Sequence, residues 1–357
     1  MSLLRAIRKH DSPQLDSLHP GAALPNGEVE IRGSGLGPHT DSHGSPHIPR
    51  AGIGDVSAPV LLSRSHRLTI KVPEGSITGD LVLHSNGTQS NALTLRVAVP
   101  LAENLHPVAN PAVDPDGNLY VTFSGPRGQQ VPVSIFRIDR DYQLRPHVRD
   151  LMNATGLAFD REGYLYASSR AEGTVYRISP DGAMSTYAEG LGVATGIAFD
   201  HDGNLFVGDR SGTIFKIARG ATPADSQQIF VYATLEPSVA AYHLAFSDNG
   251  TLYVTGPTTS SFDNLYAIAP NGDTTVFYRG LGRPQGLAFD RAGNLYVAAS
   301  LAGHRGIVRI TPGKEASLVV AGNNLIGLAF MEEGCAALAT HDAVYHVALD
   351  IEGRPLV

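Results

Sequence analysis

Two adjacent residues, Tyr242 and His243, offer acid–base chemistry, and His243 stands where four related segments of the chain have glycine. A histidine with a pKa near neutrality can donate or accept a proton during a reaction. The same residue can also be a packed, hydrogen-bonded side chain that fills the space that glycine leaves elsewhere. The sequence therefore leaves two interpretations of His243 open: a catalytic acid or base assisted by Tyr242, or a structural residue.

A second group of polar residues stands either just before or at the start of the first predicted strand of a segment, or at the end of the second strand. We predict that this group binds a ligand, and its members are Asn110, Thr155, Arg170, Thr195, Asp209, Arg210 and Gln285. Arginines recur shortly after the second predicted strand of several segments, Arg127 and Arg305 among them. At equivalent positions they can hold an anionic ligand through forked hydrogen bonds. Alternatively, they pair with acids such as Asp209 and Glu172, or face water.

Metal chemistry has weaker support in the sequence. Asp209 is the only acid near the predicted site, and one carboxylate with neutral oxygens makes a weak calcium site. His39, His43 and His47 recur every four residues in a loop rich in glycine and proline, which offers no rigid scaffold for a metal. A relay from Ser168 or Ser169 through His243 to Asp209 lacks a nucleophile-elbow motif. We therefore predict no metal and no cofactor.

These residues belong to a pattern that recurs six times at intervals of 40 to 47 residues. Each unit has an apolar run, a turn with Asp and Gly, a second apolar run, and then alternating apolar and polar residues, as in Gly196–Asp209. Such a period predicts repeated four-stranded antiparallel sheets that close into a six-bladed β-propeller. The units begin at Asn110, Gly156, Gly196, His243, Gly286 and Gly327. The Asp residues of the turns, such as Asp160, are predicted to be turn formers and not calcium ligands.

The region before the repeats has a different character. Residues 1–12 are predicted to be a flexible lead, and short strand-like runs over residues 13–99 predict a small β-sandwich. The last repeat has material for only three strands, whereas residues 96–103 resemble an outer strand with no repeat before them. We therefore expect residues 96–103 to complete the last sheet and close the ring.

Two regions of the sequence resemble known families. The runs Gly33–Pro38, Val72–Gly75 and Asn86–Asn91 resemble the IPT/TIG immunoglobulin-like family, which implies a spacer or interaction domain. The GLAFDxxGNLYV-type residues of residues 100–357 resemble the NHL-repeat and regucalcin/gluconolactonase superfamily of six-bladed propellers. That superfamily includes metal-dependent lactonases, lyases and pure binding modules. Its lactonases hold a divalent cation with Glu, Asn and Asp, but this sequence has Ala109 and Thr155 at the matching positions.

Composition sets further limits. The 357 residues are 42% apolar and carry a formal net charge of −7, so the sequence offers no global attraction to nucleic acid. The single cysteine, Cys335, excludes an intrachain disulfide, and its apolar surroundings predict a buried side chain. No run is apolar enough to predict a membrane span, and no signal peptide is recognised. The compartment stays open: the module resemblance implies an extracytoplasmic location if a signal has been removed.

Taken together, the sequence predicts an all-β protein: a small immunoglobulin-like sandwich, then a six-bladed propeller that binds a ligand on its channel face without a metal cage. The expected partner is a small-molecule or carbohydrate-like ligand, or another protein. The alternative is an enzyme, a hydrolase or lyase of the gluconolactonase-like superfamily. In that case His243 is the general acid or base, and Tyr242, Gln285 and Arg210 orient the substrate.

Overall fold

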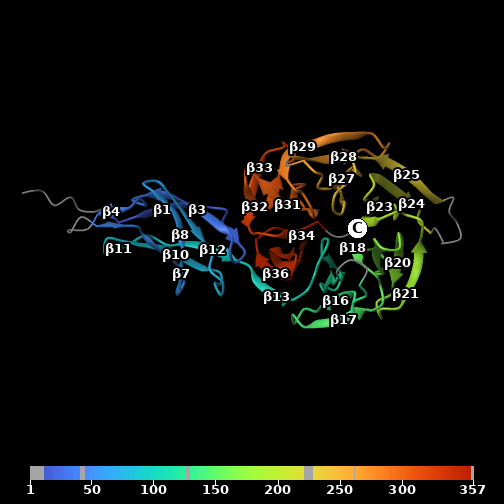
Figure 1. Ribbon diagram of the computed structural model, residues 1–357, viewed down its shortest axis with the longest axis horizontal. Coiled ribbons are helices and arrows are strands. Elements are labelled where there is room, and N and C mark those ends of the chain that lie inside the picture. Colours follow the sequence, from blue (N-terminus) through green and yellow to red (C-terminus); the bar gives the residue numbers. More distant parts are fainter. Residues whose placement is uncertain (1–11, 41–44, 126–128, 221–227, 261, 355–357) are drawn as a thin grey trace, which may run out of the picture. The chain divides into compact units, whose positions relative to one another are not determined.

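The computed structural model describes residues 12–40, 45–125, 129–220, 228–260 and 262–354 (Figure 1). The chain divides into two compact units. Unit 1 comprises Met1–Ala98 with Val319–Gly322, and unit 2 comprises Val99–Leu318 with Asn323–Val357. Of the predicted flexible lead, residues 1–11 lie outside the described residues. No helix in the described ranges has the length and apolar character that crossing a membrane requires.

Unit 1 is built from short strands in two main sheets. One sheet has the order β1-β3-β9-β8; the other runs β12-β10-β6-β7, with β11 on β10, and β2 lies parallel to β12. Burial alternates along β3, β9, β10 and β12, so each strand has one buried face. The strands of this region are β1 (Gln14–His19), β2 (Ala22–Ala23), β3 (Glu28–Ser34), β4 (His39–Thr40), β5 (Pro46–His47), β6 (Arg50–Ile53), β7 (Val56–Ala58), β8 (Val60–Arg64), β9 (Arg67–Lys71), β10 (Gly79–Ser85), β11 (Thr88–Gln89) and β12 (Leu93–Val97).

The chain from Val99 onward is also almost entirely β. Its strands, with one short 3-10 helix η2, are β13 (Val99–Glu103), β14 (Ala112–Val113), β15 (Leu119–Thr122), β16 (Ile135–Ile138), β17 (Leu144–Val148), β18 (Ala154–Phe159), β19 (Leu165–Ser169), β20 (Thr174–Ile178), β21 (Met184–Ala188), β22 (Ala194–Phe199), β23 (Leu205–Asp209), β24 (Thr213–Ile217), β25 (Ile229–Thr234), β26 (His243–Phe246), β27 (Leu252–Thr255), β28 (Asp263–Ile268), β29 (Thr274–Gly282), β30 (Leu287–Phe289), β31 (Leu295–Leu301), β32 (His304–Ile310), β33 (Ala316–Ala321), β34 (Leu325–Phe330), η2 (Glu332–Gly334), β35 (Cys335–Thr340) and β36 (Ala343–Ala348).

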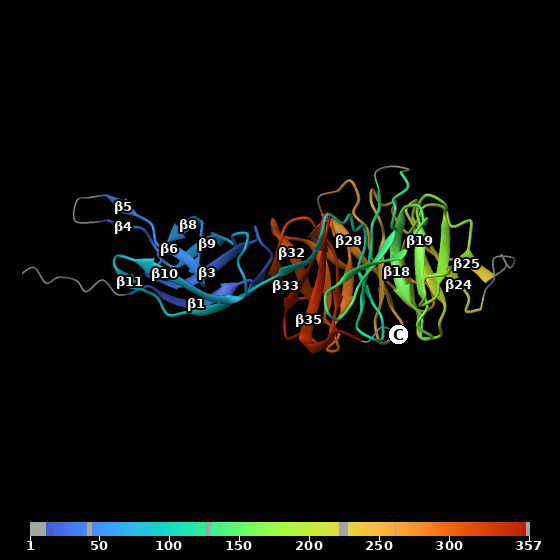
Figure 2. The ribbon, with the colours of Figure 1, turned by 90° about the horizontal axis from the view of Figure 1, so that it is seen from below.

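Consecutive strands of this region form small antiparallel sheets. Strands β14–β17, β18–β21 and β22–β25 each make a four-stranded sheet in chain order. Strands β26–β29 and β30–β33 follow the same order within a larger sheet, because Leu281 and Gly282 of β29 also pair with β31. In unit 2 the sheets stand around a common centre (Figure 1), and their strands run side by side along it (Figure 2). This arrangement is compatible with a β-propeller.

One further sheet joins the two ends of unit 2. Its order is β13-β36-β35-β34, and Val99 to Glu103 of β13 pair antiparallel with His346 to Ala343 of β36. The outer strand therefore comes from the start of the unit and the inner three from its end. The expectation that this segment completes the last sheet is confirmed. Pairing of this kind removes an exposed strand edge.

The turns follow the predicted Asp chemistry. In the second sheet, Oδ1 of Asp160 accepts hydrogen bonds from the backbone N–H groups of Glu162 (3.0 Å) and Tyr164 (2.8 Å), and Gly163 has a φ of 84°. Asp200 accepts both equivalent bonds in its sheet, and Asp290 accepts the second of them, from the N–H of Asn294. Because the carboxylate is used within the turn, these residues are turn formers, as predicted.

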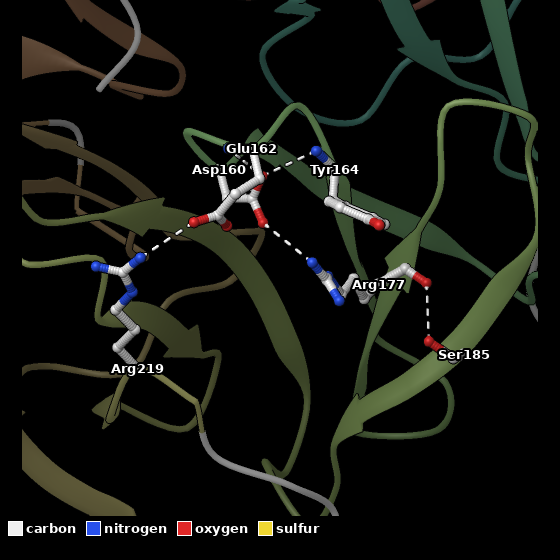
Figure 3. A network of polar contacts seen from close by, with 6 residues as sticks. All are labelled: Asp160, Glu162, Tyr164, Arg177, Ser185 and Arg219. Atoms are coloured by element: carbon white, nitrogen blue, oxygen red, sulfur yellow. Dashed lines mark hydrogen bonds and ion pairs between the residues drawn. The ribbon is translucent and has the colours of Figure 1, made fainter.

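Charged side chains surround the Asp160 turn (Figure 3). The guanidinium of Arg177 lies 3.5 Å from the centre of the Tyr164 ring, and its Nη2 lies 3.9 Å from Oδ2 of Asp160. Arg219, from the next sheet, donates to Glu162 at 3.1 Å. Basic residues occupy the same place in other sheets, as Lys216 does beside Asp200. The network is thus part of the repeat and holds the turn in place.

Aromatic rings join each sheet of unit 2 to the next. A Tyr or Phe on the second strand of one sheet meets, edge to face, the Phe that ends the first strand of the following sheet, with ring centres 4.9 to 5.1 Å apart. The pairs are Tyr120–Phe159, Tyr166–Phe199, Phe206–Phe246, Tyr253–Phe289 and Tyr296–Phe330. The repeated Phe and Tyr of the sequence therefore form the core between sheets.

Candidate functional site

The first strands of the repeats approach one another closely where they begin. The backbone N–H of Gly196 donates to the carbonyl of Tyr242 (2.9 Å), and that of Gly286 donates to the carbonyl of Ile326 (2.7 Å). A Cβ atom on Gly196 would lie 2.3 Å from the Tyr242 carbonyl oxygen. Glycine recurs at this position because neighbouring strands meet backbone to backbone.

Three of the predicted site residues lie at or next to this place, and one of them, Thr195, connects two neighbouring sheets. The hydroxyl of Thr195 donates to the carbonyl of Gly208 (2.7 Å) and accepts from the N–H of Tyr242 (3.1 Å). The hydroxyl of Thr155 donates to the carbonyl of Asn153 at 3.0 Å. The phenol of Tyr242 donates to the carbonyl of Glu236, and burial raises the pKa of that phenol. All three side chains are buried and hydrogen-bonded within the protein.

Two amide side chains connect neighbouring sheets through hydrogen bonds between residues that are far apart in the sequence. Asn110 donates from Nδ2 to the carbonyl of Leu287 (2.8 Å) and accepts at Oδ1 from the N–H of Leu328 (3.1 Å), so it connects three sheets. Gln285 donates to the carbonyl of Leu325 at 3.4 Å. Their amides contribute to closing the ring of sheets.

Asp209 is buried at the end of β23, and its carboxylate is used locally. Oδ1 accepts from the backbone N–H groups of Val193 (2.8 Å) and Ser211 (3.2 Å), and the Ser211 hydroxyl donates to Oδ2. The structure shows no ion pair between Asp209 and Arg210 among the described residues. The carboxylate fixes the loop that follows the strand.

Arg170 and Arg210 directly follow β19 and β23, the second strands of two adjacent sheets. Nη2 of the half-buried Arg170 lies 3.5 Å from the hydroxyl of Ser124, and Nε of Arg210 donates to the carbonyl of Ser238 at 3.3 Å. Burial first, and then the charge of Arg210, lower the pKa of the Arg170 guanidinium. Within the described ranges neither arginine has a carboxylate partner, since Glu172 instead accepts from the phenol of Tyr176.

His243 lies apart from these arginines, in the channel between the first strands. It is 3% exposed and lines a cavity of about 170 Å³ together with apolar side chains and Asn110. Burial lowers the pKa of His243 to about 4, so the ring is neutral at pH 7. The described residues that line this cavity include no carboxylate and no hydroxyl group.

One residue at the channel was missed by sequence reasoning. Arg354, near the carboxyl end, lines the same cavity, and it donates from Nη1 to the carbonyl of Phe246 at 2.7 Å. Its Nη2 pairs with Asp248 (2.6 Å) and donates to the ring of His201 (3.1 Å). No repeat contains Arg354, so the repeat pattern gave no signal for it.

Other sequence candidates stay outside this region. Cys335 is partly exposed, not buried as predicted, because it begins β35 beside η2; burial still raises the pKa of its thiol. The rings of His39 and His47 stack with centres 5.7 Å apart, whereas His43 and Arg127 lie outside the described residues. Among the residues that are described, no three His, Cys, Asp or Glu side chains gather as a metal site would require. The hydroxyls of Ser168 and Ser169 donate to the carbonyls of Thr195 and Met152.

Comparison with known proteins gives a likeness of fold. No family model matches the sequence, and the search of curated proteins found no match. A gluconolactonase from Xanthomonas campestris has a TM-score of 0.55 at 17% identity, covering 71% of this chain and 89% of its own. An auxiliary nutrient binding protein from Bacteroides thetaiotaomicron has a TM-score of 0.54 at 12% identity, with 95% and 98% covered. A protein of unknown function from the same organism has a TM-score of 0.55 at 14% identity, also with 95% and 98% covered. At these identities the likeness shows the fold alone.

Proposed function

We propose that this protein binds a ligand with a carboxylate or phosphate group, held between Arg170 and Arg210. The observation that carries the proposal is the half-buried Arg170, whose charge is disfavoured by burial and by Arg210 and is not balanced by a carboxylate among the described residues. The positive charges of the two guanidinium groups repel each other, and an anion bound between them would reduce that repulsion. Arginine also suits the role, because its fork matches a carboxylate or phosphate.

We also propose a finer division of the chain. We assign residues 13–99 to an immunoglobulin-like IPT/TIG domain and residues 100–357 to a six-bladed NHL-like propeller. Six groups of four strands, counting the sheet that β13 completes, support the second assignment. Two main sheets of alternating burial support the first. In this architecture the paired arginines lie at the same end of adjacent blades.

The ligand that we propose is small and carbohydrate-like, with an acid group. One protein that shares the fold is a gluconolactonase, which supports a sugar-derived ligand, and another is an auxiliary nutrient binding protein, which supports a binding role. Fold likeness alone does not carry this choice. The requirement for an acid group comes from the two arginines of this chain. The alternative ligand for Arg170 and Arg210 is a protein partner that presents a carboxylate.

Binding has better support than hydrolysis or elimination by His243. A general base works best with a pKa near the working pH, whereas burial lowers the pKa of His243 to about 4. The described cavity around it holds no hydroxyl nucleophile and no acid to orient the ring. Tyr242 and Gln285, the predicted orienting residues, are hydrogen-bonded to backbone carbonyls. The predicted acid–base role thus has no partner group in the cavity.

Replacing either arginine is expected to weaken binding of gluconate about tenfold, because a hydrogen bond to a charged group contributes about 1.5 to 3 kcal/mol. Isothermal titration calorimetry of Arg170→Ala and Arg210→Ala measures this change. Arg170→Lys keeps the charge but loses the fork, so it should recover only part of the affinity. Glucose, which has no acid group, should bind weakly to the original protein and equally weakly to the variants.

Arg219→Ala is the matched control, since it removes the same charge from the opposite end of the third sheet, where Arg219 meets Glu162. Its affinity for gluconate should equal that of the unaltered protein. If Arg170→Ala bound gluconate as tightly as the Arg219→Ala control does, the proposed site would be contradicted. Turnover of gluconolactone that disappears in a folded His243→Ala variant would contradict the binding role and favour the enzyme.

A further inference from the structure

The channel cavity of unit 2 is a second space suited to a ligand, and neither Arg170 nor Arg210 lines it. Its walls are aliphatic and aromatic side chains such as Leu157, Ile197 and Phe246. Each of these three keeps 6 to 8% of its surface exposed although it lies in the core, because it faces the cavity. Apolar atoms therefore form most of the wall, and polar atoms form the rest.

The volume, about 170 Å³, fits a molecule of one ring. For comparison, an engineered protein cavity of about 150 Å³ with walls of Leu, Ile and Phe stays dry and binds benzene. Apolar walls hold water poorly because each water molecule needs two to four polar partners. An apolar ring gains contacts that water cannot make there.

Three polar side chains interrupt this wall: Asn110, His243 and Arg354. Asn110 uses both ends of its amide on backbone groups, but no hydrogen bond is found for the His243 ring among the described residues. Because burial keeps this ring neutral at pH 7, it offers one N–H donor and one nitrogen acceptor. The ring nitrogens are not among the fully buried side-chain atoms that lack a partner, so they face the cavity, where a ligand hydroxyl can hydrogen-bond to one of them.

The end of the channel near the Asp turns is covered by the carboxyl-terminal segment. Gly353 lies so close to Phe330 that a Cβ atom would be 2.0 Å from the Phe330 Cβ. Arg354 is held by Phe246, Asp248 and His201, and Asp248 balances its charge. The described part of the cavity thus presents no unbalanced charge to attract an ion, which favours an uncharged ligand.

We propose that this cavity binds a small, uncharged, single-ring molecule with one hydroxyl group, of the phenol class, whose hydroxyl hydrogen-bonds to His243. The ring lies against the Leu, Ile and Phe side chains, and the hydroxyl supplies the partner that His243 lacks among the described residues. An anion is excluded by the apolar wall and by the neutral histidine. This site differs from the arginine pair in both position and ligand chemistry.

Titration of the full chain with phenol, toluene and benzoate tests the proposal by calorimetry. Phenol should bind more tightly than toluene, and benzoate should not bind in the cavity. In His243→Leu, affinity for phenol should fall about tenfold, the loss of one hydrogen bond, while affinity for toluene stays the same or rises. The Leu244→Trp variant, in which the larger side chain fills the cavity, should bind both phenol and toluene more weakly than the unaltered protein. His346→Leu is the matched control, because His346 is a half-buried histidine on β36 that does not line the cavity.

A second measurement guards against variants that fail to fold. In the unaltered protein labelled with ¹⁵N on histidine, phenol should shift the His243 ring signals and leave those of His346 in place. Absence of phenol binding, or binding that leaves the His243 signals unchanged, would overturn the proposal. Equal affinity for phenol in the unaltered protein and a folded His243→Leu variant would overturn it too.

Discussion

Gly196→Ala is expected to lower the free energy of unfolding by about 3 kcal/mol, a large effect for a single methyl group. The added Cβ would lie 2.3 Å from the carbonyl oxygen of Tyr242 and 2.9 Å from the Cα of His243. Both atoms belong to the backbone of the next first strand, so no side chain can rotate away. The two strands would have to separate, which would also lengthen the 2.9 Å hydrogen bond from Gly196 to Tyr242.

Urea unfolding followed by circular dichroism measures this loss, and Gly313→Ala serves as the matched control. Gly313 has the same change in chemistry, but its nearest neighbour would be the Thr311 hydroxyl at 3.7 Å, an ordinary contact. At such an open position alanine is neutral or slightly stabilising, since it restricts the unfolded chain. If the two variants were equally stable, close strand contact would not be the reason for the recurring glycine.

The sequence could predict the parts of this fold that depend on neighbours in the chain. Hairpins, their Asp turns and the period of the sheets all follow from local pattern, because the Asp160 carboxylate bonds to residues two and four positions ahead. The pairing of β13 with β36 was also predictable, since an outer strand without a repeat needs a sheet to complete. In unit 1 the strand-like runs over residues 28–32, 59–62, 67–72, 80–85 and 92–97 correspond to β3, β8, β9, β10 and β12, whereas β1, β6 and β7 give no clear signal in the sequence.

The partners of the candidate site residues could not be predicted in this way. Asn110 bonds to residues 177 and 218 positions away, and nothing in its local sequence indicates that both ends of its amide are used. The same holds for Arg354, which lies outside the repeats and whose partners Phe246 and His201 belong to two different repeats. Repetition places equivalent side chains of all repeats at the same level along the channel. Which contacts form across the channel depends on the positions at which the repeats have different residues.

His243 is one of those differences, and it should make the protein less stable in mild acid. Its pKa is about 4 in the folded protein because burial disfavours the charged ring, against 6.5 in the ordinary state. Between these values the unfolded chain binds one proton more than the folded chain, so stability falls as the pH falls. At about 1.4 kcal/mol for each pH unit, the loss reaches about 2 kcal/mol at pH 5 and about 3 kcal/mol below pH 4.

Urea unfolding at pH 7 and pH 5 of the unaltered protein and of His243→Leu isolates this contribution. Other groups titrate in both proteins, among them His147 and His346, whose pKa values are also lowered by burial, so only the difference between the two pH slopes is assigned to His243. The unaltered protein should lose about 2 kcal/mol more than the variant between these pH values. If the free energy of unfolding changed equally with pH in the unaltered protein and in His243→Leu, His243 would be protonated as readily in the folded protein as in the unfolded chain. Water or a charged partner would then have to reach the ring, and the apolar cavity that defines the proposed phenol site would be wrong as well.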